Sequence, residues 1–225
     1  MKLFKSTLSL FTVVMIIATT VFTSCKKDSD TDVGGSQSAI GEVGNEFTLS
    51  QIQGIDNVTA SVISVKKDVS TISISGTLVE ESLKELAASI PNIDKFGSYD
   101  PVTGEFTGKI KMKFTKEGIV DYLNVAERPF VLVKFDAKVG DTYTCEKANG
   151  GGTFTRTVTR LSTEDDFPYE GMWIKTITVE EPGRNRAVKK IVYEINHKFG
   201  LVHANVFMQD GSVIPAYLHS DNLNE

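Results

Sequence analysis

Several residue types are scarce in this sequence, and each shortage disfavours particular classes of protein. The 225 residues include only two cysteines, and 29 acidic side chains outnumber 24 basic ones. The acidic excess disfavours DNA or RNA as a partner, because nucleic-acid phosphates require clustered Lys and Arg. A phosphate loop is also absent, since Gly150–Gly152 leads into strand-like residues and not into a helix that starts with Lys-Ser/Thr. Otherwise the composition, 40% hydrophobic and 24% charged, is that of an ordinary globular protein.

Only one long uncharged run is present, and it lies at the start of the chain. Lys2 and Lys5 precede a run from Leu8 to Phe22, and no acidic residue occurs before Asp28. A basic segment followed by about 15 apolar residues and small residues is typical of a secretory signal peptide. A membrane-spanning helix is the alternative, but it needs about 20 apolar residues, and threonines dilute this run. We predict a signal peptide over residues 1–24.

The end of this run carries a family resemblance. Val21-Phe-Thr-Ser-Cys25 resembles the lipobox of bacterial lipoproteins, and Lys26-Lys-Asp-Ser-Asp30 is similar to the start of mature lipoproteins from the Bacteroidota. The resemblance implies acylation of Cys25, with chains such as palmitate, and a lipid anchor in the outer membrane. It leaves open whether the protein faces the periplasm or the cell surface. Simple secretion with an unpaired Cys25 is the alternative.

Removal of the signal peptide changes both charge and cysteine pairing. Residues 25–225 keep 22 basic and 29 acidic side chains, a net charge of −7. Acylation of Cys25 leaves Cys145 without a partner, so we predict no intramolecular disulfide and a buried, structural Cys145. Residues 25–46, rich in Asp, Ser, Thr and Gly, predict a flexible tether, and residues 47–225 predict a single β-rich domain.

Short runs of β-branched and aromatic residues fill this domain. Turn signals such as Asp100-Pro101 and Asp210-Gly211 separate them, and in Phe106–Phe114 apolar residues alternate with Thr and Lys. This pattern predicts about ten strands in sequential order, with one wet face. The expected fold class is β-dominated α+β: an antiparallel meander that forms a strongly curved sheet or partly open barrel, with one packed amphipathic helix.

Residues 77–90 predict that helix. Thr77 would be its N-cap and Glu80 would complete a capping box, while Pro91 would end it. The apolar residues at helical spacing would form the stripe that packs on the sheet: Val79, Leu83, Leu86 and Ile90.

A second resemblance concerns the body of the domain. Residues 118–123, 130–143 and 196–202 are similar to segments of Bacteroidota lipoproteins that share no known activity. The resemblance therefore implies location and class, and no catalytic residue or cofactor.

Aromatic residues in or beside predicted loops are the candidate ligand-binding residues: Tyr99, Phe167, Tyr169 and Trp173. Exposed aromatic rings with flanking acids are one way in which proteins hold sugars, whereas packing in the core is the alternative for the same residues. His197 and His203 would face each other if Phe199-Gly200 formed a tight turn, and they are weak candidates for a metal site without a third ligand.

These features predict a non-enzymatic, lipid-anchored domain that binds an apolar ligand or a glycan. An envelope assembly component that recruits a partner protein through exposed strand edges is the alternative. A hydrolase that combines an acid of Glu164–Asp166 with His197 or His203 is the third hypothesis, and the sequence alone supplies no nucleophile, base and orienting group for it.

Overall fold

A computed structural model describes residues 25–26, 33–50, 54–81, 84, 87, 97–123, 128–147, 152–183 and 188–220. The predicted signal peptide lies outside the described residues. Within them the chain forms sixteen strands and one short 3-10 helix. Their bounds are β1 Cys25–Lys26, η2 Ala39–Gly41, β2 Glu46–Ser50, β3 Ile55–Lys66, β4 Val69–Leu78, β5 Gly97–Tyr99, β6 Glu105–Thr115, β7 Gly118–Asp121, β8 Phe130–Lys134, β9 Thr142–Lys147, β10 Thr153–Leu161, β11 Phe167–Tyr169, β12 Met172–Ile174, β13 Ile177–Pro182, β14 Val188–Asn196, β15 Gly200–Met208 and β16 Val213–Ser220.

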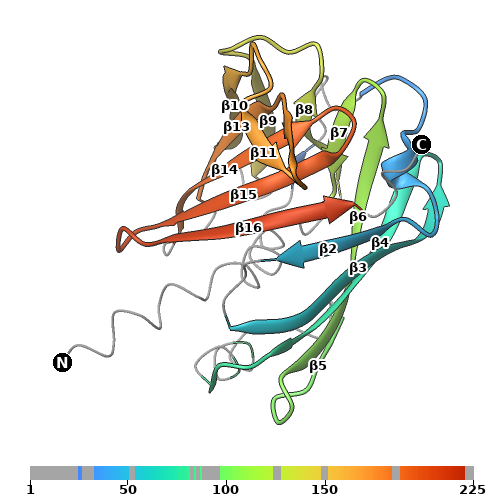
Figure 1. Ribbon diagram of the computed structural model, residues 1–225, viewed down its shortest axis with the longest axis vertical. Coiled ribbons are helices and arrows are strands. Elements are labelled where there is room, and N and C mark those ends of the chain that lie inside the picture. The colour runs from blue at the N-terminus through green and yellow to red at the C-terminus, as the bar shows by residue number, and fades with distance from the viewer. Residues whose placement is uncertain are drawn as a thin grey trace.

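Fourteen of these strands form one antiparallel sheet that curls into a nearly closed barrel (Figure 1). The order along the sheet is β1-β9-β10-β13-β14-β15-β16-β2-β3-β4-β6-β7-β8, and β5 pairs with β6. The predicted fold class is confirmed, and helix content is minimal. The order departs from a simple meander because β16 pairs with β2 and β1 pairs with β9, and because β11–β12 is a separate hairpin between β10 and β13.

Side-chain alternation decides which face of each strand turns inward. In β4 every second residue is buried, and in β6 Met112 and Phe114 are buried while the lysines between the apolar residues lie on the other face. The inward residues of the long strands join one continuous hydrophobic core. Burial of this apolar surface is the main force that holds the sheet curved.

The predicted helix begins later than expected. Thr77 and Leu78 belong to β4, where Thr77 pairs with Asp56 of β3 and Glu105 of β6, so Thr77 is not an N-cap. Glu81, Lys84 and Ala87 are helical, and Val79 is 47% exposed, so it is not part of a buried stripe. Strand pairing on both sides outweighs the local capping signal. Leu83, Leu86, Ile90 and Pro91 lie outside the described residues.

The predicted tether is also shorter than expected. Val33 and Ile40 are buried in the main core, and Asn45 is fully buried with its side-chain amide donating to Ile40 O at 2.7 Å. Ser38 N donates to Phe114 O at 3.0 Å, which fixes this segment on β6. The polar composition of residues 33–46 is therefore that of a hydrogen-bonded surface segment and not of a free linker.

Among the described residues no backbone ladder joins β8 to β9 across the gap in the barrel, and side chains join them instead. Along the sheet order β8 is an end strand, yet Phe130–Val133 are almost completely buried. Lys134 N donates to the hydroxyl of Tyr143 in β9 at 3.0 Å. Burial of Tyr143 raises the pKa of its hydroxyl, so this group stays neutral while it accepts the bond.

Arg156 of β10 makes most of the side-chain contacts that join the two ends of the barrel sheet. Its Nη1 donates to the carbonyl oxygens of Phe130 and Val131 at 3.2 and 2.9 Å, and its guanidinium carbon lies 3.9 Å from the centroid of the Phe130 ring. Nη2 lies 2.5 Å from Asp121 Oδ2, and Nε donates to Glu181 Oε2 at 2.6 Å. The side chains of Arg156 and both acids are at most 3% exposed. Burial acts to lower the pKa of Arg156, but the two carboxylates outweigh it and the pKa is raised.

Cys145 differs from its prediction in one respect. It is buried in the main core, as expected, but it is disulfide-bonded, whereas the sequence interpretation left it without a partner. The sequence contains one other cysteine, Cys25. The backbone of Cys25 and Lys26 pairs with β9, the strand that holds Cys145. The prediction of no intramolecular disulfide is therefore wrong for this structure.

Candidate functional site

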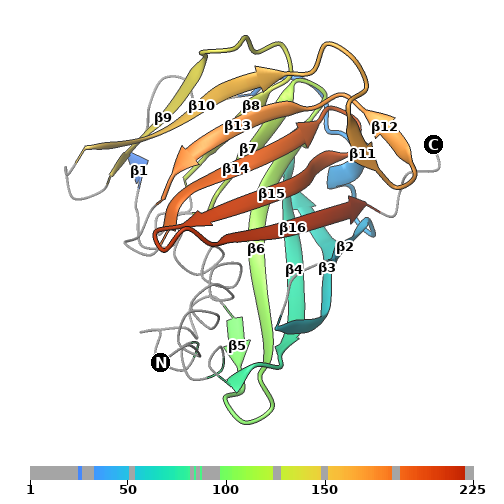
Figure 2. The same cartoon turned by 60° about the vertical axis from the view of Figure 1, so that its left-hand side comes forward.

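The β11–β12 hairpin lies on the outside of the barrel, near the start of β15 and the end of β16 (Figure 2). Its two faces differ in burial: Tyr169 and Ile174 are 3% and 6% exposed, whereas Trp173 is 64% exposed. Trp173 pairs across the strands with Pro168, which is also exposed, so both side chains occupy the outward face. The hairpin thus presents an aromatic ring to solvent from an anchored base.

Phe199 and Val202 form a second hydrophobic cluster with the inward residues of the hairpin, and three rings of β15 and β16 adjoin it. We name this surface beneath the hairpin the hairpin seat: Phe199, Val202, His203, Tyr217 and His219. A register shift in β15 creates it. Glu194 of β14 pairs with His203, and Ile195 pairs with Leu201, so Val202 has no cross-strand partner on β14. A bulge of this kind lets two consecutive side chains, Val202 and His203, reach the same outer face.

Aromatic stacking holds the hairpin on the seat. The ring of Tyr169 stacks on Phe199 and on His219, with centroids 4.9 and 5.6 Å apart. Phe167 packs on His203 at 5.8 Å. The backbone of β16 adds a hydrogen bond, because Ser220 N donates to the Tyr169 hydroxyl at 3.3 Å. These contacts make the hairpin part of the folded body and not a free loop.

His219 connects the hairpin to the sheet by its two ring nitrogens. Nε2 lies 3.1 Å from the Ser50 hydroxyl oxygen at the end of β2, and Nδ1 lies 2.5 Å from Glu170 Oε1 in the hairpin turn. The Nδ1 contact is out of line for a hydrogen bond, so it is an ion-pair distance without good donor direction. A serine, a histidine and a carboxylate thus meet at one point from three distant parts of the chain.

His203 is the most enclosed histidine of the seat. It is 6% exposed, its ring lies 4.3 Å from that of Tyr217, and its Nε2 has no hydrogen-bond partner among the described residues. Burial lowers the pKa of His203, because the charged imidazolium would lose its hydration there. The imidazole is therefore held in its neutral form near neutral pH.

This burial makes stability depend on pH. Since the pKa of His203 is lower in the folded than in the unfolded chain, the unfolded chain binds more protons as pH falls below about 6.5. We expect wild-type protein to lose stability there, by at most about 1.4 kcal/mol per pH unit from this group. Denaturant unfolding between pH 7 and 5 checks this. His203→Gln should flatten the profile, and His197→Gln, at an exposed turn residue, should not. Equal slopes for wild type and His203→Gln would contradict the assignment.

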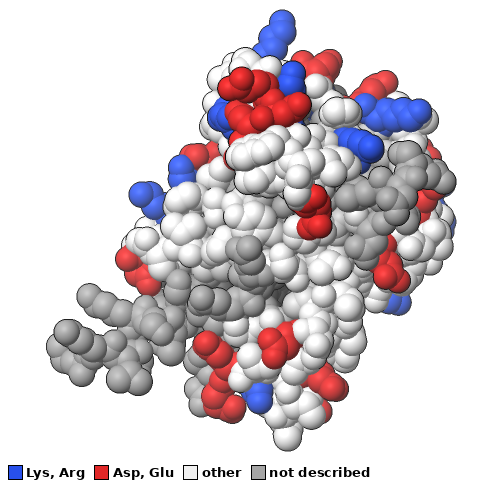
Figure 3. Space-filling model, viewed as in Figure 1, with Lys and Arg blue, Asp and Glu red and all other residues white. Residues whose placement is uncertain are grey.

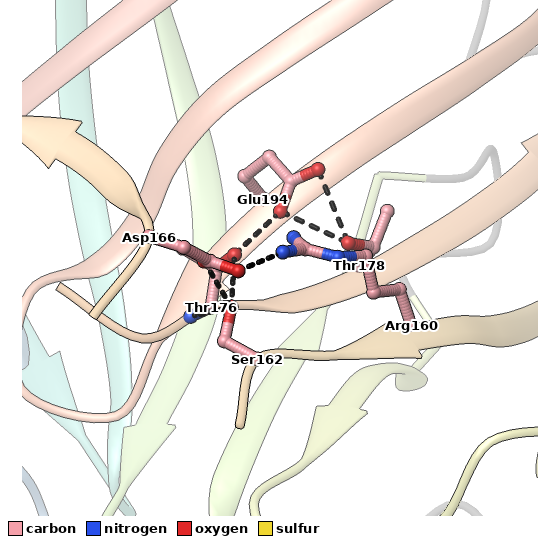
Figure 4. A network of polar contacts seen from close by, with 6 residues as sticks. All are labelled: Arg160, Ser162, Asp166, Thr176, Thr178 and Glu194. Atoms are coloured by element: carbon pink, nitrogen blue, oxygen red, sulfur yellow. Dashed lines mark hydrogen bonds and ion pairs between the residues drawn. The ribbon is translucent and has the colours of Figure 1, made fainter. Parts of the chain in front are cut away.

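A polar network fixes the base of the hairpin (Figure 4). Ser162 at the end of β10 donates its hydroxyl to Asp166 Oδ1 at 2.7 Å and accepts a bond from Thr176 N at 3.0 Å. Asp166 also pairs with Arg160, and Thr176 donates to Glu194 Oε2 at 2.7 Å. The Thr178 hydroxyl reaches the same carboxylate at 3.0 Å. Both carboxylates are thus occupied by fixed donors, which favours a structural role for this network.

The structure separates the four aromatic residues of the sequence prediction. Phe167, Tyr169 and Trp173 share the hairpin, but the first two pack inward and Trp173 alone is largely exposed. Tyr99 lies on β5 beside β6, packs on the main core and donates its hydroxyl to Lys84 O at 2.9 Å. Tyr99 therefore belongs to a different part of the barrel.

The histidine pair of the metal hypothesis does not form across the ladder. Asn196 pairs with Gly200, so His197 lies in the turn, and the cross-strand partners of His203 are Glu194 and Tyr217. In the part of the chain that the structure describes, no three His, Cys, Asp or Glu side chains are placed to hold a metal ion. Glu164 and Asp165 are exposed, and Asp166 is held by Arg160 and Ser162.

Sequence reasoning missed Ser50, Glu170 and His219 as a group. They are 49 to 169 residues apart along the chain, and only the pairing of β16 with β2 and the seating of the hairpin bring them together. One local signal was available: Glu170-Gly171 is a two-residue turn with positive φ at both positions, where Asn-Gly is the usual choice.

Comparison with known proteins adds no relative: no family model, curated protein or solved structure matches this chain. No helix among the described residues is long and apolar enough to cross a membrane.

Proposed function

We propose that this chain is a lipid-anchored lipoprotein of the bacterial outer membrane whose barrel binds a glycan through the exposed face of the β11–β12 hairpin. The main support for this proposal is the exposure of Trp173, which is 64% exposed on a hairpin whose opposite face packs on the sheet through Tyr169 and Ile174. A flat indole on a rigid support is suited to stack on a sugar ring, and little conformational entropy is lost on binding because the support is already ordered.

The barrel interior supports an apolar ligand less well. The inward side chains of the described strands pack into one continuous core, and Arg156 with its two acids occupies part of it. Assembly through strand edges has less support as well, since the end strand β8 is buried and its carbonyl groups accept bonds from Arg156. On the face shown in Figure 3, basic and acidic side chains are interspersed, without one continuous basic surface of the kind that nucleic acid requires.

The anchor proposal rests on the sequence pattern around Cys25. Seven residues separate Cys25 from Val33, the first described residue packed in the core. At about 3.3–3.6 Å per residue, this segment reaches at most roughly 28 Å. An acylated Cys25 would therefore keep the barrel close to the membrane surface, on the periplasmic or the outer side.

Trp173 is the only tryptophan, so fluorescence excited selectively in tryptophan reports on the proposed site alone. We expect at least one of a set of gluco-, manno-, galacto- and xylo-oligosaccharides to change the emission in a saturable titration. By calorimetry, Trp173→Ala should weaken binding of that sugar about 30-fold, as expected for a central aromatic contact worth about 2 kcal/mol. Val102→Ala, at an exposed residue of the β5–β6 loop, is the matched control and should bind as wild type does. The proposal fails if no oligosaccharide alters the emission, or if Trp173→Ala binds with unchanged affinity.

A further inference from the structure

We propose that Ser50, His219 and Glu170 form a site that hydrolyses carboxylic esters on the outer face of the barrel. The three side chains have the arrangement that nucleophilic catalysis requires: a hydroxyl beside one imidazole nitrogen and a carboxylate beside the other. This inference does not depend on glycan binding by Trp173, since it rests on different residues.

The distances fit the roles of nucleophile and general base. Ser50 Oγ lies 3.1 Å from His219 Nε2, within the reach over which a base can accept the hydroxyl proton. Glu170 Oε1 lies 2.5 Å from Nδ1 but out of line with the N–H direction. Misaligned contacts are common in ligand-free sites and tighten when substrate binds, so the direction of this contact does not exclude the role.

The histidine is held in place by its neighbours. The Tyr169 ring stacks on it with an interplanar angle of 28°, and the hydroxyl of Tyr169 accepts a bond from Ser220 N, the residue after His219. The imidazole is thus fixed between the hairpin and the strand end. A base that is already oriented loses little entropy when it enters the reaction.

The conformation of Glu170 is a second observation that points to this site. Glu170 has φ of 46° and is followed by Gly171 with φ of 77°, so both turn residues occupy the left-handed region. A glutamate is unfavourable there, whereas Asn or Gly would fit the turn without strain. Strained residues of this kind cluster at functional sites, and here the strained side chain is the one that contacts His219.

The reaction proceeds in two balanced steps. Ser50 Oγ attacks the ester carbonyl carbon while its proton passes to His219 Nε2, the bond from carbon to the alcohol oxygen breaks, and the alcohol leaves with that proton. Water then gives a proton to Nε2 and attacks the acyl-serine. Ser50 leaves with this proton, and the carboxylic acid is released. Glu170 stabilises the imidazolium that forms in each step.

The position of the site favours small, accessible acyl groups. The side chains of His219 and Glu170 are 21% and 48% exposed, so an ester displayed on a larger molecule can approach from solvent. Short acyl esters, such as acetyl groups, are the substrate class that needs no deep acyl pocket.

Full-length mature protein is tested with a fluorophosphonate probe and with p-nitrophenyl acetate. We expect covalent labelling of wild type, loss of labelling in Ser50→Ala, and ester hydrolysis lowered about 100-fold or more in Ser50→Ala and His219→Gln. Ser64→Ala, at an exposed serine of β3, is the matched control and should remain labelled. Wild type without labelling, or Ser50→Ala with undiminished labelling, would overturn the proposal.

Glu170→Gly separates catalysis from a purely structural contact. Glycine relieves the strain of the turn, so the melting temperature should hold or rise while kcat falls. If His219 and Glu170 served only to clamp the hairpin, hydrolysis would not respond to Glu170→Gly, and that result would also overturn the proposal.

Discussion

Replacement of Arg156 by methionine is expected to lower the free energy of unfolding by about 3–5 kcal/mol, because it removes one partner from a buried ionic cluster. Asp121 and Glu181 would keep their positions at 3% exposure or less, but without the guanidinium that faces them. The carbonyl oxygens of Phe130 and Val131 in β8 would also lose the hydrogen bonds that Arg156 donates to them. Such a loss is a large part of the total stability of an ordinary domain.

Chemical denaturation followed by far-UV circular dichroism measures the change. Arg160→Met is the matched control, because Arg160 lies on the same strand and also pairs with an acid, but its side chain is 49% exposed. An exposed pair contributes about 0–1 kcal/mol, so the control should be close to wild type. A triple variant, Arg156→Met with Asp121→Leu and Glu181→Leu, should regain much of the loss, since apolar replacement of a whole buried cluster is often tolerated. Equal effects of Arg156→Met and Arg160→Met would show that Arg156 does not close the barrel.

The fold class was predictable because alternation along a strand is a local property. In Phe106–Phe114 the alternation of apolar and polar residues distinguishes the inward from the outward face. In the structure Met112 and Phe114, on the apolar face, are buried. Non-local features were not predictable in the same way. The pairing of β16 with β2 and the inward-facing Arg156 depend on which strands become neighbours, and an arginine in a strand reads as a solvent-facing residue.

Local signals also failed where tertiary contacts outweighed them. Thr77 has good capping chemistry, yet hydrogen bonds to strands on both sides keep it in β4. Residues 33–46 have linker composition, yet Val33 and Ile40 supply enough apolar surface to dock the segment. The same limit applies to the candidate sites. Trp173 could be nominated from composition and its place in a loop, whereas the meeting of Ser50 with His219 requires the finished sheet.

Replacement of Cys25 by serine is expected to move the protein from the membrane fraction to the soluble fraction and to abolish incorporation of labelled palmitate. Each buried acyl methylene contributes about 0.8 kcal/mol, so two or more chains on one residue hold the protein on the membrane almost permanently, and their loss releases it. Cys145→Ser is the matched control. Cys145 is buried in the barrel and carries no lipid in this proposal, so this variant should stay in the membrane fraction.

The disulfide of Cys145 provides a second test of the lipid anchor at Cys25. Cys25 is the only other cysteine of the chain, and a sulfur that carries lipid through a thioether cannot also form a disulfide. In lipid-anchored protein from the native host, Cys145 should therefore be alkylated by iodoacetamide after denaturation without reductant, and mass spectrometry should find lipid on an N-terminal Cys25. Palmitate labelling that persists in Cys25→Ser, or a Cys145 that is alkylated only after reduction, would exclude the anchor at Cys25. The latter result would instead assign both cysteines to a covalent link between the N-terminal segment and β9.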